Sequence, residues 1–131
     1  MDRIIALVPA YNEAKKIAGV VEATKQYLPV WVIDDGSVDN TAQVAEEAGA
    51  LVIRQSPNQG KGTALRRGFQ MALDESVEAV ITLDADGQHD PAEIADFLAL
   101  YRNKPSQLII GCRDSARCHF SDVSPIRSAT N

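Results

Sequence analysis

Short apolar runs alternate along this chain with longer segments in which apolar residues recur at helical spacing. Five such runs predict strands, at Ile4–Val8, Val30–Ile33, Leu51–Ile53, Ala79–Leu83 and Leu108–Ile110. This alternation is typical of βαβ units wound into a parallel sheet. Because the runs are almost continuously hydrophobic, we expect strands that are covered by helices on both faces. The predicted fold class is therefore α/β with a mainly parallel sheet.

Four helices are expected in the segments between and after these strands. The first carries an apolar stripe at Ile17, Val20, Val21, Thr24 and Leu28, and the third at Leu65, Phe69, Ala72 and Leu73. The second is expected over residues 39–48, with Gly49 as the residue that follows its C-cap. The fourth is expected to begin with Asp90 and Pro91 and to bury Ile94, Phe97, Leu98 and Tyr101.

The size and charge of the chain exclude several classes of protein. Its 131 residues suffice for one domain, and its formal net charge of −5 excludes binding of nucleic acid through bulk charge. The N-terminal apolar run of Ile4–Val8 is too short for a signal peptide or a membrane span, so we expect a cytoplasmic protein. Cys112 and Cys118 are expected to be free thiols.

The distinctive polar residues all follow predicted strands directly. They lie in four segments, at residues 9–13, 34–37, 84–90 and 111–113. In an open parallel α/β sheet the ligand crevice lies beyond the carboxyl ends of the strands, because the connecting loops and the helix N-termini meet there. We therefore expect these four segments to face one cleft.

Asp84 and Asp86 form an Asp-x-Asp pair after the fourth predicted strand. Carboxylates gathered in one cleft repel each other unless they are solvated or neutralised by a cation. Hard oxygen ligands without thiolates favour Mg²⁺ or Mn²⁺ over zinc, and such an ion can hold the phosphates of a substrate. The alternative is that these aspartates only cap turns and helices.

Two further segments invite a phosphate or nucleotide interpretation. Asp34 and Asp35 precede a Gly-Ser turn, and either acid can accept hydrogen bonds from a base or a ribose; a capped helix start is the competing interpretation. Lys61 lies in a Gly-Lys-Gly segment that either approaches a diphosphate or simply turns into the third helix. A phosphate-binding P-loop is excluded, because Gln55 and Gly62 stand where it requires Gly and Ser or Thr.

Other sites find less support in the sequence. No G-x-G-x-x-G follows the first predicted strand, which argues against a dinucleotide cofactor. Cys112, Cys118 and His119 lack the spacing of a structural zinc site, and we interpret His89 as a solvated turn residue rather than a ligand.

Taken in order, these blocks resemble the family 2 glycosyltransferases of the GT-A fold. The matching text is Val-Pro-Ala-Tyr-Asn-Glu, Asp-Asp-Gly-Ser-x-Asp-x-Thr, Asn-x-Gly-Lys-Gly, Leu-Asp-Ala-Asp-Gly-Gln-His-Asp-Pro and Gly-Cys-Arg, over residues 4–113. Asp-Gly-Gln-His-Asp-Pro is most similar to the subgroup that makes polyprenyl- or dolichyl-phosphate sugars. The resemblance implies a Rossmann-like domain over residues 1–113 that binds a nucleotide-diphosphate sugar, and an irregular tail over 114–131.

The resemblance also implies roles for individual residues. It places Pro9, Ala10, Tyr11, Glu13 and Asp35 at the nucleoside. With Asp34, Lys61 and Asp84 they make up the predicted nucleotide-binding residues. It makes Asp84 and Asp86 the ligands of Mg²⁺ or Mn²⁺, with Gln88 also reaching the metal. Arg113, and with it Arg127, corresponds to arginines that meet phosphate groups near the acceptor. The implied reaction is an inverting displacement at the anomeric carbon of the sugar, with Asp84, Asp86 and Arg113 as its catalytic residues.

Family members continue past the point where this chain stops, into an acceptor-binding half, so we expect a truncated chain. If the acceptor is a lipid phosphate, the protein is expected on the inner face of a membrane, where the anionic acceptor needs no general base. The alternative is a catalytically silent nucleotide-binding or interaction module, with a homo-oligomer covering the surface left by truncation. A nucleotidyltransferase of related architecture lacks support, because no Gly-rich loop follows the first strand.

Overall fold

The structure is a computed structural model that describes residues 4–86 and 92–103 of the 131. Its strands form one sheet in the order β3-β2-β1-β4, and every neighbouring pair is parallel. The elements are β1 (Ile4–Ala10), α1 (Ile17–Lys25), β2 (Val30–Asp35), α2 (Thr41–Glu47), β3 (Leu51–Gln55), α3 (Lys61–Asp74), β4 (Ala79–Thr82) and α4 (Ala92–Asn103). The prediction of an α/β fold with a parallel sheet is confirmed.

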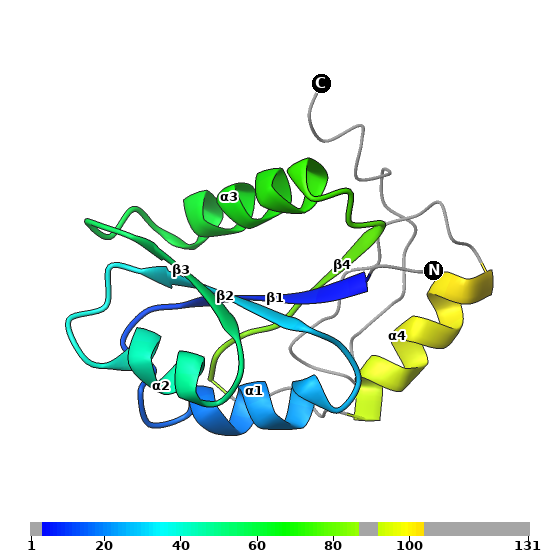
Figure 1. Ribbon diagram of the computed structural model, residues 1–131, viewed down its shortest axis with the longest axis horizontal. Helices are drawn as coiled ribbons and strands as arrows, with labels where there is room; N and C mark the ends of the chain where they lie inside the picture. The colour runs from blue at the N-terminus through cyan, green and yellow to red at the C-terminus, as the bar shows by residue number, and fades with distance from the viewer. Residues whose placement is uncertain (1–3, 87–91, 104–131) are drawn as a thin grey trace.

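Helices cover both faces of the sheet, as Figure 1 shows: α3 lies on one face, and α1, α2 and α4 lie on the other. Two apolar clusters fill the space between the sheet and these helix layers. One joins residues of alternate positions of β1 and β2 to α1, α2 and α4, and the other joins the opposite faces of the same strands to α3. Trp31 of β2 is buried in the second cluster.

The central strand and the edge strand differ in burial. All seven residues of β1 are buried, because β2 and β4 flank this strand and helices cover both of its faces. The expectation that every strand is fully covered is wrong for β3, where Leu51 is 52% exposed and Val52 and Ile53 are only partly buried. Among the described strands, β3 lies at an end of the sheet and pairs with β2 alone, which leaves it more exposed than the central strand.

The predicted stripe of α3 packs on the sheet, but small residues make the closest contacts. Of the predicted stripe, Ala72 is buried, Leu65 and Phe69 are partly buried and pack against the core on this face, and Leu73 is partly buried. The fully buried residues of α3 are the small ones, Ala64, Gly68 and Ala72. The reason is close approach: a Cβ atom on Gly68 would lie 2.5 Å from both methyl carbons of Leu7 in β1.

The other helices follow their predicted patterns more closely. In α1 the buried residues are Ile17, Val21 and Thr24. The second helix begins at Thr41 rather than at Asp39, and Gly49 follows its C-cap with a φ of 107°, as expected for that position. Ile94 of α4 is buried as predicted.

Some predictions lie outside the described residues. They are the Asp90-Pro91 helix start, the strand at Leu108–Ile110, the two cysteines, His89 and the tail at 114–131. The domain boundary at residue 113 therefore stays a prediction. Within the described ranges, no helix combines the length and the apolar character needed to cross a membrane.

Candidate functional site

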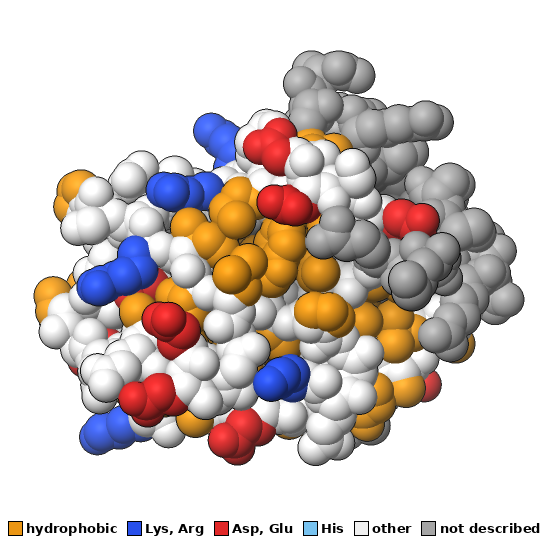
Figure 2. Space-filling view, in the orientation of Figure 1, with side chains coloured by type: hydrophobic (Ala, Val, Ile, Leu, Met, Phe, Trp, Pro, Cys, Tyr) orange, Lys and Arg blue, Asp and Glu red, His pale blue; other side chains and the backbone are white. Residues whose placement is uncertain are grey.

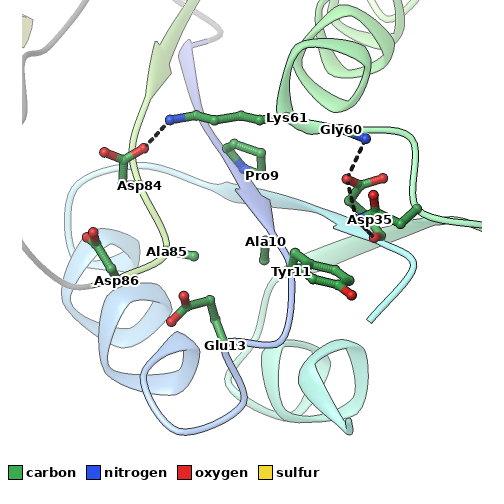
Figure 3. Close-up of a pocket in the computed structure, with 11 residues that line it drawn as sticks. Pro9, Ala10, Tyr11, Glu13, Asp35, Gly60, Lys61, Asp84, Ala85 and Asp86 are labelled. Carbon is green, nitrogen blue, oxygen red and sulfur yellow. Dashed lines mark hydrogen bonds and ion pairs between the residues drawn. The ribbon is translucent and has the colours of Figure 1, made fainter. Parts of the chain in front are cut away.

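A pocket of about 340 Å³ opens at the carboxyl ends of β1, β2 and β4, where the sequence places the ligand crevice. Figure 3 shows its residues converging from these strand ends and from the start of α3. The lining consists of Pro9, Ala10, Tyr11, Glu13, Asp35, Asn58, Gly60, Lys61, Asp84, Ala85 and Asp86. The pocket is thus built from segments up to 77 positions apart in the sequence, held together by the strand order.

The structure brings most of the candidate site residues together. Eight of them line the pocket, namely Pro9, Ala10, Tyr11, Glu13, Asp35, Lys61, Asp84 and Asp86. Asp34 does not line it, and Gln88, Arg113 and Arg127 lie outside the described residues. Three lining residues, Asn58, Gly60 and Ala85, are not among the predicted site residues, although the motifs that pointed to the site contain them.

The loop after β1 is fixed by side chains of the loop after β2. The Asn12 amide donates to Ser37 Oγ at 2.8 Å, and the Glu13 amide donates to Thr41 Oγ1 at 3.0 Å. Asp39 accepts from the Ala14 amide at 3.3 Å. The hydroxyl and acidic residues at 37, 39 and 41 therefore hold the backbone that carries Tyr11 and Glu13. This function of the Ser-x-Asp-x-Thr spacing is clear only when both loops are seen together.

Asp39 combines this long-range contact with a local one. The Thr41 hydroxyl donates to Asp39 Oδ1, which also accepts from the Thr41 amide at 3.0 Å. The hydrogen bond from the Thr41 side chain lowers the pKa of Asp39 below its ordinary value. The residue is therefore a carboxylate at neutral pH, and it caps the turn that leads into α2.

Asp35 is held by four hydrogen bonds, from the last residue of β3 and from the segment between β3 and α3. Its Oδ1 accepts from Gln55 Nε2 at 2.7 Å and from the Gln59 amide at 2.7 Å. Its Oδ2 accepts from Asn58 Nδ2 at 3.0 Å and from the Gly60 amide at 2.8 Å. A carboxylate offers about four acceptor sites, so protein donors satisfy this side chain completely.

The same network determines the charge of Asp35. Burial by itself raises the pKa of this carboxyl, but the hydrogen bonds from Gln55, Gln59 and Gly60 oppose burial and leave the pKa below its ordinary value. Asp35 is thus ionised at neutral pH although only 3% of the residue is exposed. Its charge fixes the loop that begins α3, and a direct contact between Asp35 and a base or ribose stays a prediction.

Asp34 and Gly36 flank Asp35 and determine the path of the backbone around it. Asp34 is completely buried, accepts from the Ser37 amide at 3.1 Å, and lies 3.5 Å from Arg54 Nε. Gly36 has a φ of 71°, and a Cβ atom there would lie 2.5 Å from the Asn58 backbone nitrogen. The Asp-Asp-Gly-Ser motif therefore requires glycine because the loop before α3 passes directly against it.

The opposite side of the pocket carries Asp84, Asp86 and Lys61. Lys61 Nζ lies 2.6 Å from Asp84 Oδ1, so this ion pair links the start of α3 to the segment after β4. In Figure 3, Asp84 and Asp86 lie together on one side of the pocket and Asp35 on the other, with Ala10 and Tyr11 between them. Tyr11 is 49% exposed, which leaves its ring available to a ligand.

The charge of the lining restricts what the pocket can bind. Its described residues include four carboxylates, Glu13, Asp35, Asp84 and Asp86, against the ammonium of Lys61. A diphosphate entering such a pocket would be repelled unless a cation came with it. The described residues contain no cluster of three or more His, Cys, Asp or Glu side chains that could hold a metal ion by themselves.

Two carboxylates nevertheless suit a shared metal site. Mg²⁺ usually takes one or two carboxylates from the protein and fills its remaining positions with phosphate oxygens and water. Asp84 and Asp86 offer hard oxygen ligands of this kind in a pocket large enough for a phosphate-bearing ligand. The donor set therefore fits a divalent cation that arrives with a phosphorylated substrate.

Comparison with known proteins identifies the family. The sequence model described as Glycosyl transferase family 2 matches residues 5–128, nearly the whole chain. The chain belongs to glycosyl transferase family 2. This membership confirms the resemblance that the five motifs indicate. Four of the five blocks contribute residues to the pocket, and the fifth, Gly-Cys-Arg, lies outside the described residues.

Two relatives of this family 2 chain illustrate the match. An uncharacterised protein of Methanocaldococcus jannaschii is 41% identical over 86% of this chain and 47% of its own length. The UDP-N-acetylglucosamine–dolichyl-phosphate N-acetylglucosaminyltransferase of Methanococcus voltae is 31% identical over 99% of this chain and 60% of its own length. The chain therefore spans about half to three fifths of these two relatives.

Solved structures share the fold of this family 2 domain. Glucosyl-3-phosphoglycerate synthase from Mycobacterium tuberculosis in complex with UDP is 25% identical, with a TM-score of 0.68 over 81% of this chain and 42% of that protein. Another structure of that enzyme contains Mn²⁺, UDP and glucosyl-3-phosphoglycerate and is 24% identical, with a TM-score of 0.67 over the same shares of the two chains. The likeness confirms a GT-A type α/β fold for this chain.

Proposed function

We propose that this chain binds a nucleoside-diphosphate sugar in the pocket at the carboxyl ends of β1, β2 and β4. We further propose that it takes part in transferring the sugar from this donor to an acceptor. The observation that carries the proposal is the division of one pocket into two ends. One end has the exposed aromatic ring of Tyr11, and the other has the Asp84–Asp86 pair with Lys61. A nucleoside diphosphate has two matching parts, a flat aromatic base and an anionic diphosphate.

The nucleoside end is formed by the segment that ends β1. Pro9, Ala10 and Tyr11 provide apolar surface, and the ring of Tyr11 can stack on a base, a contact worth about 1–3 kcal/mol in nucleic-acid complexes. Asn58 and Gly60 complete this side through the loop that Asp35 holds. We propose that Asp35 acts mainly by placing this loop, since protein donors fill its acceptor sites.

The diphosphate end is formed by Asp84, Asp86 and Lys61. Asp84 and Asp86 would hold a Mg²⁺ or Mn²⁺ ion, which supplies the charge that stabilises the departing nucleoside diphosphate. Lys61 can add a further positive charge at the same phosphates, because its side chain is 57% exposed and can turn toward them. Gln88 and Arg113 stay predicted contributors to the metal and to the acceptor phosphate.

The proposed reaction is a single inverting displacement. An acceptor oxygen forms a bond to the anomeric carbon of the sugar while the bond from that carbon to the β-phosphate oxygen breaks. The nucleoside diphosphate leaves with the electron pair. The task of the protein is to hold the sugar in line between donor and acceptor and to keep the leaving diphosphate neutralised.

We propose a polyprenyl phosphate as the acceptor class. Support comes from the Methanococcus voltae relative, whose name gives a dolichyl phosphate as the acceptor. The Asp-Gly-Gln-His-Asp-Pro motif of this chain, which resembles the subgroup that makes polyprenyl- or dolichyl-phosphate sugars, also supports it. A phosphate acceptor is already ionised near neutral pH, so no general base is required. Such an acceptor would place the working protein at the inner face of a membrane.

Isothermal titration calorimetry tests the donor half of the proposal. We expect heat of binding when UDP-sugars or GDP-sugars are added to the folded chain with Mn²⁺, and little heat when Mn²⁺ is replaced by a chelator. Comparing the two nucleotides then assigns the base. A folded sample that gives no heat with either sugar nucleotide in Mn²⁺ contradicts the proposed function.

A further inference from the structure

The ion pair between Lys61 and Asp84 crosses the end of the pocket that the proposed function gives to the metal. Lys61 is the first residue of α3, and Asp84 lies two positions after β4, so the pair connects two otherwise separate segments. Figure 3 shows the Lys61 side chain extended toward the Asp84 carboxylate. An ammonium group therefore lies against a carboxylate that the proposed function gives to the divalent ion.

The backbone that carries Lys61 is held by a hydrogen bond, whereas the Lys61 side chain is largely exposed. The amide of Gly60, the residue before Lys61, donates to Asp35 Oδ2 at 2.8 Å and thereby anchors the start of α3. The Lys61 side chain itself is 57% exposed, against 17% for that of Asp84. A lysine with a fixed backbone and a solvated tip can change partners without rearrangement of the fold.

The Lys61 ammonium group and a divalent ion compete for the Asp84 carboxylate. A metal ion bound by Asp84 would lie close to Lys61 Nζ, and their repulsion is twice that of two unit charges at the same distance. A nucleoside diphosphate relieves this conflict, because its phosphates offer Lys61 a new anionic partner. Both cations then have anionic ligands, and neither has to leave the pocket.

We propose that the Lys61–Asp84 ion pair is an internal competitor of the divalent ion, and that the diphosphate releases it by drawing Lys61 away. This inference rests on the proposed function, because it assigns a regulatory contact within the same site. It makes metal and nucleotide bind cooperatively: each ligand raises the affinity of the other by the same factor. The ligand-free protein correspondingly holds Mn²⁺ weakly.

Titration with Mn²⁺ alone, followed by the electron paramagnetic resonance signal of free Mn²⁺, measures the competition without any catalytic readout. Lys61→Met removes the ammonium group and keeps the length of the side chain. We expect this variant to bind Mn²⁺ about two- to fivefold more tightly than the unchanged chain, the range that a partly exposed ion pair supports. Lys61→Arg keeps the charge and should bind Mn²⁺ like the unchanged chain.

Arg67→Met is the matched control, because it removes one positive charge from an exposed position of the same helix outside the pocket lining. We expect no change in Mn²⁺ affinity from this substitution. In a second titration, UDP at a saturating concentration should raise the Mn²⁺ affinity of the unchanged chain by a larger factor than that of Lys61→Met. Circular dichroism confirms that each variant is folded.

The outcomes separate this inference from the proposed function. Equal Mn²⁺ affinities for Lys61→Met and the unchanged chain overturn the competition, even if both bind UDP in the presence of Mn²⁺. An equal gain in Lys61→Met and Arg67→Met overturns it too, since the effect would then be general charge. Absence of UDP binding with a selective gain in Lys61→Met contradicts the proposed function and supports the competition. If neither the unchanged chain nor any variant binds Mn²⁺, with or without UDP, both proposals fail.

Discussion

At the scale of single residues, Asp35 links three parts of the site. It ends β2, and its four hydrogen bonds reach Gln55 at the end of β3 and the loop that starts α3. A carboxylate is suited to this position because every group that faces it is a donor. Asparagine has nearly the same shape but would direct an amide group at those donors, which leaves hydrogen-bond donors unpaired in a buried site.

Replacing Asp35 with asparagine should therefore lower the free energy of unfolding by about 1.5–3 kcal/mol, the range for hydrogen bonds to a charged group. The lowered pKa of Asp35 also makes part of the stability of the unchanged chain depend on pH. This part is fully present above the ordinary value of 3.8 and is lost as the pH falls through the lower pKa of the folded state.

Urea unfolding at neutral pH and at several values below 3.8 measures both effects. We expect the unchanged chain to lose more stability over this range than Asp35→Asn does. Asp96→Asn, at an exposed position of α4, serves as the control and should unfold like the unchanged chain at neutral pH. An Asp35→Asn variant as stable as the unchanged chain at neutral pH would show that the network contributes little.

Asp86 provides the opposite case, a residue whose predicted role is binding rather than stability. It lines the pocket and lies four positions after the last residue of β4, outside the sheet. Asp86→Ala should weaken Mn²⁺-dependent nucleotide binding by about tenfold or more, at least the effect seen for residues that merely orient metal ligands. The melting temperature should stay nearly constant.

Calorimetry and thermal unfolding of the same Asp86→Ala sample test this prediction, with Asp96→Ala as a control outside the pocket. A large fall in melting temperature would instead favour the interpretation that the acids after β4 cap the turn. Unchanged nucleotide affinity in a folded Asp86→Ala sample would remove this residue from the proposed metal site.

At the scale of elements, the packing of α3 on the sheet depends on small residues. Leu7 is fully buried, so its methyl groups have little room to move away from a Cβ atom added at Gly68. Gly68→Ala gains about 1 kcal/mol in helix propensity, but overpacking of a core costs about 1–3 kcal/mol. We expect the second effect to dominate and the variant to be less stable.

Gly19→Ala is the matched control, since it lies in α1 with no atom within 4 Å of the added Cβ. This substitution should stabilise the protein by about 0.5–1 kcal/mol, because it only replaces glycine in an exposed helix interior. Thermal or urea unfolding of the two variants gives the comparison. If both glycines behave alike, close packing between α3 and Leu7 is not what requires glycine at position 68.

At the scale of the whole molecule, the oligomeric state and the response to nucleotide distinguish a donor-binding domain from an interaction module. Exposed apolar surface is what an oligomer would cover. Figure 2 shows apolar side chains gathered in the middle of one face, below α3. Leu51 and Tyr27 are the exposed large apolar residues beside a second cavity at the other ends of the strands, which Pro29 and Trp31 also line. An oligomer that covers such surface stays the alternative prediction.

Size-exclusion chromatography with light scattering, combined with thermal unfolding, decides between the two. We expect a monomer whose melting temperature rises by several degrees with Mn²⁺ and a nucleotide-diphosphate sugar. A ligand at 100 times its dissociation constant stabilises the folded state by about 2.7 kcal/mol. An obligate oligomer whose melting temperature is indifferent to nucleotide would instead support the interaction module.

Much of this architecture follows from the sequence alone. The apolar runs determined the parallel sheet, since continuous burial of a strand requires helices on both faces, and the motifs after the strands determined where the pocket lies. Both inferences depend on local patterns and on the general rule that loops meet at the carboxyl ends of parallel strands. They needed no knowledge of which side chains touch.

Only the tertiary structure decided what each polar side chain contacts. Asp34 and Asp35 are adjacent and chemically identical, yet one is turned into the protein and the other lines the pocket, because successive residues of a strand point to opposite faces. The partners of Asp35 lie 20 to 25 positions away, and Lys61 meets Asp84 across 23 positions. Such contacts depend on how the strands are ordered in space, which no local pattern specifies.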